Sequence, residues 1–280
     1  MKLLPLFTLA VSGAITVGST SAANTSASFD GGADTALTLE RFGDPGQASI
    51  QTTGGNGGGY LQLTDKVNGQ NNWASFDRTH VGTAPQSTFS FQFRIDSTAS
   101  ADGFSFSYAD TSKYGVSGGV GAPVFTPEDP KAAGILGFGF DTWSNNGGVD
   151  TASPDDPAQA QSSDYQEISV FYDNSLVARV NDTRTLGLTL DDGLWHDVYG
   201  TVDFAGGTVS MTVDGKTIFG NQAVAGLTPF ESRAIFAART GGENELAGID
   251  NLNITYVPEP SIMALGGLGL GMLFLRKRKN

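Results

Sequence analysis

The chain contains no cysteine and only two histidines, His80 and His196, among its 280 residues. The lack of cysteine excludes disulfides, thiolate catalysis and zinc sites built from cysteine. Neither histidine stands in a His-x-x-His or His-Glu-x-x-His pattern. With only two histidines available, neither a histidine-rich metal site nor a Ser-His-Asp triad is expected. Without disulfides the domain must rely on a large apolar core, which a chain of this length can bury.

Basic residues are also scarce, with 16 Lys and Arg against 29 Asp and Glu. Lys2, the last four cations and Glu259 belong to terminal segments; the 11 basic and 28 acidic residues that remain give the body a net charge near −17. Nucleic acid is therefore not an expected partner, because phosphate binding needs clustered cations. The acidity suits an extracellular solute and supplies the hard oxygen ligands that Ca²⁺ prefers.

Residues 1–22 have the pattern of a secretory signal peptide. Lys2 provides the positive start, residues 3–17 are apolar, and the small residues 20–23 suit a signal peptidase. We therefore expect export and leave this segment out of the fold.

The chain ends in a short polar motif, an apolar run and a basic cluster, in that order. The motif is Val257-Pro258-Glu259-Pro260, the run covers residues 261–275, and the cluster is Arg276-Lys277-Arg278-Lys279. This order resembles the PEP-CTERM sorting tail of bacterial envelope proteins, a resemblance confined to residues 257–280. It implies cutting by an exosortase-type membrane enzyme and a final place in the cell envelope or extracellular matrix.

The length of the apolar run bears on whether the tail is a permanent anchor. As a helix, residues 261–275 span roughly 20 Å, which is short against a hydrocarbon core of about 30 Å. The basic cluster should stay cytoplasmic, which puts the body outside. We expect transient anchoring in the inner membrane through this segment; the alternative is an ordinary single-span anchor that is never cut.

Residues 23–256 form the expected folded domain. Apolar residues alternate with polar ones in many short segments, which is typical of half-buried strands, and no long helical period is present. Asp214-Gly215 is a strong hairpin turn signal. The sequence therefore predicts an all-β sandwich or barrel. The clearest strands are expected in residues 88–96, 104–108, 168–172, 198–204, 209–213 and 249–256.

Two segments carry a more specific resemblance. Ala101-Asp102-Gly103-Phe104-Ser105-Phe106 and Gly137-Phe138-Gly139-Phe140-Asp141-Thr142-Trp143-Ser144-Asn145 resemble the L-type, or legume-type, lectins, and Gly118-Gly119-Val120-Gly121 lies where that family has a glycine loop. The resemblance is clear over residues 87–175 and implies the concanavalin A-like jelly-roll sandwich. Leu194-Trp195-His196 with Val213-Asp214-Gly215 resembles the laminin-G variant, so strand pairing at the domain ends stays open between the two.

The resemblance also implies a binding site. It makes Asp102 an acceptor for sugar hydroxyls after a cis Ala101–Asp102 bond, with Asn145 and the backbone of Gly118 and Gly119 as further contacts and Trp143 as a stacking face. It assigns Asp141, Asn145 and, as a later acidic ligand, Asp150 to Ca²⁺. The family's adjacent transition-metal site is not expected, because Gly139 replaces its glutamate and Gln166 or Glu167 replaces its histidine.

Other interpretations of these residues remain open. Asp102-Gly103 and Asn145-Asn146-Gly147-Gly148 are also ordinary turn sequences. Trp73 and Tyr114 can stack on sugar, but Trp73 and Trp195 suit the core equally well. Glycoside hydrolysis needs two facing carboxylates; Gly139 leaves Asp141 without one, and Glu243-Asn244-Glu245 lies in a glycine-rich loop.

We therefore expect a non-catalytic carbohydrate-binding protein that recognises polysaccharide or another glycoconjugate. The first alternative is a structural matrix protein without specific glycan binding, and the second is a polysaccharide-cleaving enzyme.

Overall fold

The computed structural model describes residues 22–31, 37–43, 46–97, 100–143 and 166–257. Residues 1–21 of the predicted signal peptide and residues 258–280 of the sorting tail lie outside these residues. In the described part, strands alternate with turns and two helical turns. The strands are β1 Ala23–Ala27, β2 Leu37–Arg41, β3 Ser49–Gln51, β4 Tyr60–Gln62, β5 Asn71–Phe76, β6 Gln86–Asp96, β7 Gly103–Asp110, β8 Ile135–Asp141, β9 Glu167–Tyr172, β10 Ser175–Val180, β11 His196–Asp203, β12 Thr208–Val213, β13 Lys216–Ala223, β14 Ser232–Arg239 and β15 Leu246–Val257; the helical turns are α1 Thr111–Tyr114 and the 3₁₀ turn η1 Thr183–Leu186.

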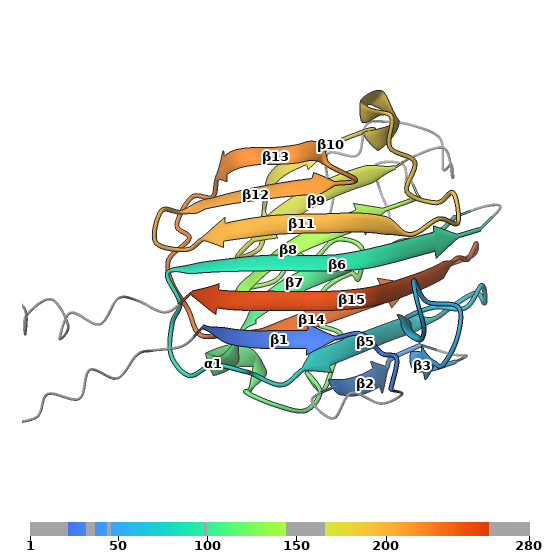
Figure 1. Ribbon diagram of the computed structural model, residues 1–280, viewed down its shortest axis with the longest axis horizontal. Helices are drawn as coiled ribbons and strands as arrows, with labels where there is room; N and C mark the ends of the chain where they lie inside the picture. The colour runs from blue at the N-terminus through green and yellow to red at the C-terminus, as the bar shows by residue number, and fades with distance from the viewer. Residues whose placement is uncertain (1–21, 32–36, 44–45, 98–99, 144–165, 258–280) are drawn as a thin grey trace, which may run out of the picture. The chain divides into compact units, whose positions relative to one another are not determined.

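The strands form two antiparallel sheets that pack face to face (Figure 1). The eight-stranded sheet has the order β13-β12-β11-β6-β15-β4-β3, and β1 pairs with β15 beside this path. The seven-stranded sheet has the order β10-β9-β8-β7-β14-β5-β2. The predicted all-β sandwich is confirmed, and the first and last strands of the domain lie next to each other.

The strands predicted from alternation are confirmed where the pattern is strongest. In β6, the odd-numbered residues from Ser87 to Ile95 are buried and their neighbours are partly exposed or exposed. Asp214 and Gly215 both have positive φ, 50° and 72°, as a tight turn between β12 and β13 requires.

The main core lies between the sheets and is rich in phenylalanine. Ring centres of Phe89, Phe91 and Phe93 on β6 lie 4.9–6.4 Å from rings on β7 and β8, a spacing typical of favourable aromatic pairs. This core is large enough to replace the disulfides that the sequence cannot form.

A long connection covers the outer face of the seven-stranded sheet. Residues 115–134 join α1 to β8, and Phe125 packs on Trp73, with 4.5 Å between ring centres. Gly137 and Gly139 allow this approach, since a Cβ at either position would clash with Pro130 or with the backbone oxygen of Glu128. β7 and β8 are consequently buried on both faces.

Neither helical turn is long and apolar enough to cross a membrane, and the described residues hold no other helix.

Candidate functional site

Asp102 lies at the start of β7, at the edge of the seven-stranded sheet. Its peptide bond to Ala101 is cis, as the lectin resemblance implies. The Asp102 backbone donates a hydrogen bond to the Arg239 carbonyl (3.2 Å) and accepts one from the Thr142 amide (3.0 Å). Gly103 pairs with Asp141, so the structure brings Asp102 and Asp141 to adjacent strand ends, as expected.

Asp141 is the last residue of β8 and its side chain is almost completely buried. One carboxylate oxygen accepts a hydrogen bond from the Trp143 amide (2.8 Å). Burial raises the pKa of Asp141 well above its usual range, and the charges of Asp129, Glu128 and Glu167 raise it further. Asp141 therefore sits in an acidic, dry environment that favours a bound proton or a cation.

We define the acidic cluster as Asp102, Glu128, Asp129, Asp141, Glu167 and Glu245; from the sequence, Glu128 and Asp129 were not singled out, and Glu167 and Glu245 were not connected with Asp102. All six side chains are buried. Glu128 and Asp129 lie on the covering connection, and Glu245 lies on the loop before β15, where from the sequence it was considered only as part of a Glu243-Asn244-Glu245 pair. No spacing pattern links these segments, so the cluster exists only through tertiary contacts.

Glu245 is hydrogen-bonded to Thr142, the residue that follows Asp141. Its Oε2 accepts a hydrogen bond from the Thr142 hydroxyl (2.7 Å). Burial raises the pKa of Glu245 to about 8, and the nearby charge of Asp102 contributes in the same direction. Glu245 is therefore held largely as the neutral acid at pH 7.

Two arginines balance part of the negative charge. The Nε of Arg239 lies 2.7 and 2.8 Å from the two carboxylate oxygens of Glu128 and 3.6 Å from Asp102 Oδ2. Arg179 lies 3.3 Å from Glu167 Oε2. Arg239 thus ties the covering connection to the end of β14 and bridges it to Asp102.

The glycine loop that was predicted to contact the sugar does not lie beside Asp102. Gly118 donates its N–H to Asp77 (3.0 Å) and its carbonyl accepts from Arg233 (2.6 Å). Arg233 pairs with Ala109 in the ladder where Arg239 pairs with Gly103, six residues or roughly 20 Å along the strand. The structure therefore does not bring Gly118 together with Asp102.

The remaining amides of this loop hold an internal carboxylate. Val120 and Gly121 donate to the two oxygens of Glu40 at 2.5 and 2.9 Å, and a Cβ on Gly119 would clash with the same group. Glu40 thus stands in the kind of backbone cradle that the sequence assigned to a sugar, and the glycines serve that close approach.

The aromatic residues that were predicted to stack on sugar differ in their exposure and contacts. Trp73 is fully buried against Phe42 and Phe125, so it belongs to the core. Tyr114 donates its hydroxyl to the Ala133 carbonyl (2.7 Å). Trp143 is partly exposed two residues after Asp141, a position that suits a stacking face. Asn145 and Asp150 lie outside the described residues.

Calcium is the metal that the lectin resemblance implies. Within the described residues, no group of three or more acidic or histidine side chains is arranged to hold a metal ion. The donor chemistry nevertheless fits Ca²⁺, because Asp141 is a buried carboxylate whose pKa other carboxylates raise. The described residues thus supply one predicted ligand, Asp141, and an environment that favours a cation.

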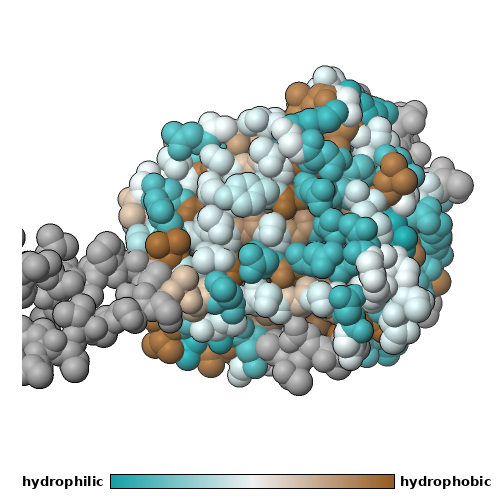
Figure 2. Space-filling model, viewed as in Figure 1, coloured by the Kyte–Doolittle hydropathy of each residue, from teal (hydrophilic) through white to brown (hydrophobic). Residues whose placement is uncertain are grey.

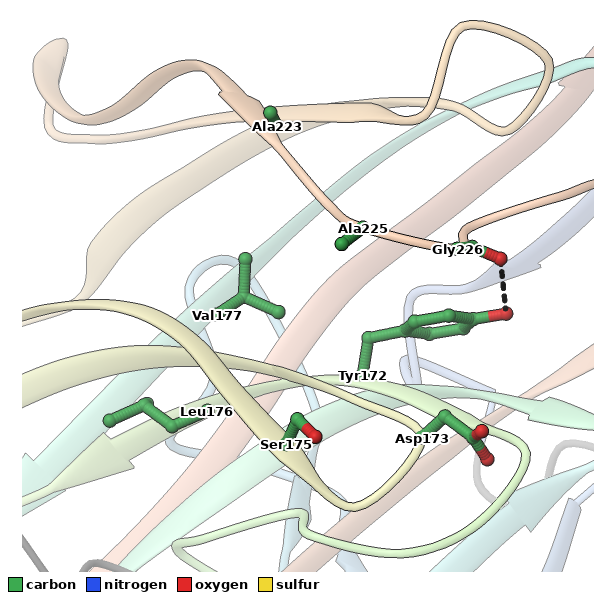
Figure 3. Close-up of a pocket in the computed structure, with 8 residues that line it drawn as sticks. All are labelled: Tyr172, Asp173, Ser175, Leu176, Val177, Ala223, Ala225 and Gly226. Atoms are coloured by element: carbon green, nitrogen blue, oxygen red, sulfur yellow. Dashed lines mark hydrogen bonds between the residues drawn. The ribbon is translucent and has the colours of Figure 1, made fainter.

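A separate pocket lies between the edges of the two sheets (Figure 3). It has a volume of about 410 Å³ and lies between the β9–β10 hairpin and the end of β13, with Tyr172 donating to the Gly226 carbonyl at 3.4 Å. Tyr172 pairs with Leu136, whereas Glu167 pairs with Asp141. The pocket is therefore at the opposite end of β8 from the acidic cluster and is not part of that site.

Comparison with known proteins agrees with this architecture. Residues 257–279 match the model of the PEP-CTERM protein-sorting motif. No curated protein matches the sequence. Similar solved structures include peanut lectin with a nine-residue peptide (16% identity, 84% of this chain and 97% of that chain, TM-score 0.53) and lectin II from Ulex europaeus (16%, 84% and 98%, TM-score 0.55).

The Ca²⁺/Man3GlcNAc-bound exoplasmic/lumenal domain of VIP36 is also similar (13% identity, 80% of this chain and 87% of that chain, TM-score 0.51). At these identities the likeness establishes the fold alone. The chain therefore joins a domain with the concanavalin A-like fold of legume-type lectins to a PEP-CTERM sorting motif that directs export to the cell envelope.

Proposed function

We propose that the protein is an exported, non-catalytic, lectin-like protein that binds polysaccharide through a site built on Asp102. The observation that carries the proposal is the position of Asp102 beside Asp141, at the adjacent ends of β7 and β8. Carboxylate oxygens accept hydrogen bonds strongly, so Asp102 suits two hydroxyls of one sugar ring. Asn145 adds an amide contact and Trp143 a stacking face.

The proposed metal is Ca²⁺, held by Asp141, Asn145 and Asp150. When bound, the ion would supply positive charge beside carboxylates that are otherwise unfavourable together. Asp141 then orients the Thr142–Trp143 backbone, whose Thr142 amide holds the Asp102 carbonyl. The proposed partners are surface or matrix glycans and, at the tail, an exosortase-type enzyme. Initial anchoring in the inner membrane through residues 261–275 belongs to the same proposal.

Replacing Asp102 by asparagine tests the glycan site. The change keeps the size of the side chain and removes its charge, so two charge-assisted hydrogen bonds weaken and affinity should fall about 100-fold or more. The measurement is binding of the purified protein to a glycan array, followed by titration calorimetry with the best ligand. Asp65→Asn removes the same charge from an exposed position and should bind as the wild type.

Two outcomes of that experiment count against the proposal. If Asp102→Asn binds as tightly as the wild type, Asp102 is not in the site. If the wild type leaves the whole array blank with and without Ca²⁺, the structural matrix protein becomes the better interpretation.

Calcium dependence is a separate expectation. Ligand at 100 times its dissociation constant stabilises the folded state by about 2.7 kcal/mol, which raises the melting temperature of a domain this size by roughly 5–10 °C. Because the pKa of Asp141 is raised, protons compete with Ca²⁺, and the shift in melting temperature should be larger at pH 8 than at pH 6.

Thermal unfolding with Ca²⁺ or with chelator measures this shift, and Asp141→Asn should abolish it. If the melting curves with Ca²⁺ and with chelator coincide at both pH values, Ca²⁺ is removed from the proposal.

A further inference from the structure

The outer face of the eight-stranded sheet carries a second group of residues, on the side of that sheet that faces away from the strands of Asp102 and Asp141. Gly248 on β15 pairs with Arg94 on β6 at one side and with Gln62 on β4 at the other. His196 pairs with Phe93, which places Trp195 beside Arg94 at the start of β11. The four strands therefore present Trp195, Arg94, Gly248 and Gln62 as one row across the sheet.

Gly248 makes a shallow gap in this row. A Cβ on Gly248 would lie 2.9 Å from the Tyr60 ring and 3.4 Å from the Trp195 ring, so both rings lean over the glycine. The two rings meet edge to face with 5.8 Å between their centres. Any larger residue at position 248 would push the aromatic pair apart.

Arg94 lies against both rings. Its guanidinium carbon is 4.9 Å from the centre of the Trp195 ring and 5.2 Å from that of Tyr60, within the range of cation–π attraction. The rings restrict the side chain before any ligand arrives, which lowers the entropy that binding must overcome. Arg94 remains partly exposed, so an external ligand can reach it.

Arg94 has no carboxylate partner among the residues that the structure describes. Among the described residues, no carboxylate lies within ion-pair distance of Arg94, and its Nε is buried without a hydrogen-bond partner. Other arginines here do have carboxylate partners: Arg78, Arg179, Arg184 and Arg239. Arg41 and Arg233 also make no ion pair among the described residues, and Arg94 differs from them in lying against two aromatic rings on a partly exposed face.

We propose that Arg94 binds the carboxylate of a uronic acid within an acidic polysaccharide, with Trp195 beside the sugar ring. The planar guanidinium matches a carboxylate with two parallel hydrogen bonds, and the partly exposed Trp195 ring offers apolar surface to the pyranose. Tyr60 is buried and positions the guanidinium.

On the same face of the sheet, Gln62 accepts the Tyr60 hydroxyl (3.0 Å), and the Gln92 amide donates to Asp197 (2.7 Å) and accepts from Asn251 (2.7 Å), so both side chains are held in place within the protein. Figure 2 shows polar residues gathered over the end of this face where β6 ends and β11 and β15 begin.

This site does not depend on Asp102. The acidic cluster repels an anionic sugar, whereas Arg94 attracts one, so the two faces of the sandwich are suited to different glycans. A protein with both sites can connect a neutral and an acidic polysaccharide. Failure of the Asp102 proposal leaves the Arg94 proposal unaffected, and the reverse also holds.

The test is calorimetric titration of the purified protein with polygalacturonate oligosaccharides, their methyl esters and dextran sulfate. We expect binding to the free acid and none to the methyl ester, which has the same ring without the charge. Arg94→Gln should weaken binding at least about tenfold. Arg94→Lys should weaken it as well, because an ammonium cannot make the two parallel bonds.

The matched control is Arg41→Gln, which removes one guanidinium charge from an exposed position on the other sheet and should bind normally. Asp102→Asn should also bind polygalacturonate normally. The proposal is overturned if the wild type does not bind the free acid, if it binds the ester or dextran sulfate equally well, or if Arg41→Gln weakens binding as much as Arg94→Gln. Thermal unfolding of each variant checks its fold, and Arg94→Lys decides the matter if Arg94→Gln does not fold.

Discussion

Replacing Arg239 by methionine is expected to lower the free energy of unfolding by about 3 kcal/mol or more. Arg239 contacts both oxygens of Glu128, whose side chain is fully buried, and lies 3.6 Å from Asp102. Methionine keeps much of the apolar stem and removes the charge, so Glu128 is left buried without its counter-ion. Urea unfolding at pH 7 measures the loss.

The second half of this experiment identifies the cause. Adding Glu128→Gln to the Arg239→Met variant should restore at least half of the lost stability, because the uncompensated charge is gone. Arg184→Met breaks an exposed ion pair with Asp182 and should cost less than about 1 kcal/mol. If the double variant is as unstable as Arg239→Met alone, the loss comes from packing and not from the charge of Glu128.

Local pattern was sufficient to predict the class of the fold. The alternation in β6 and the Asp214-Gly215 turn depend on neighbouring residues, and both are confirmed. The order of strands in the sheets was not available from such patterns. β6, for example, lies between β11 and β15, and its pairing with them joins residues more than 100 positions apart.

The part of the candidate site that could be predicted lies in two recognisable sequence segments. Asp102 and Asp141 lie in recognisable segments, and the Gly103–Asp141 pairing brings those segments together. Glu128 was not predictable, because its place depends on how residues 115–134 cross the sheet. Gly139, which looked like a lost metal ligand, has a structural reason: a side chain there would collide with the Glu128 backbone.

The glycine loop shows why a motif does not fix the role of its residues. Backbone amides at Val120 and Gly121 hold an anion, whereas the motif predicted contacts from the Gly118 and Gly119 backbone to a sugar. The anion is the side chain of Glu40, brought there by β2, and Gly118 is bonded to Asp77. The same donors cannot serve a sugar at Asp102 while these contacts last.

The buried Glu245 should make the stability of the protein depend on pH in a direction opposite to that of a typical surface acid. Its pKa is raised from 4.5 to about 8 in the folded state, so between these values the folded protein holds a proton that the unfolded chain releases. The contribution of Glu245 to stability is therefore fully present below about pH 4.5 and is lost as the pH rises towards 8. The cost at pH 7 is about 3 kcal/mol, taking 1.36 kcal/mol for each pKa unit.

Glu245→Gln removes this dependence. Glutamine can still accept the hydrogen bond from Thr142, and it carries no proton to lose, so the variant should be more stable than the wild type by about 3 kcal/mol at pH 7 and nearly equal to it at pH 4.5. Urea unfolding with chelator at pH 4.5, 6, 7 and 8 gives both curves. Glu243→Gln changes an exposed glutamate two residues earlier and should follow the wild type throughout. A constant difference between Glu245→Gln and the wild type over this range would mean that Glu245 does not titrate there. The pH dependence would then have to come from Asp141, whose pKa burial also raises.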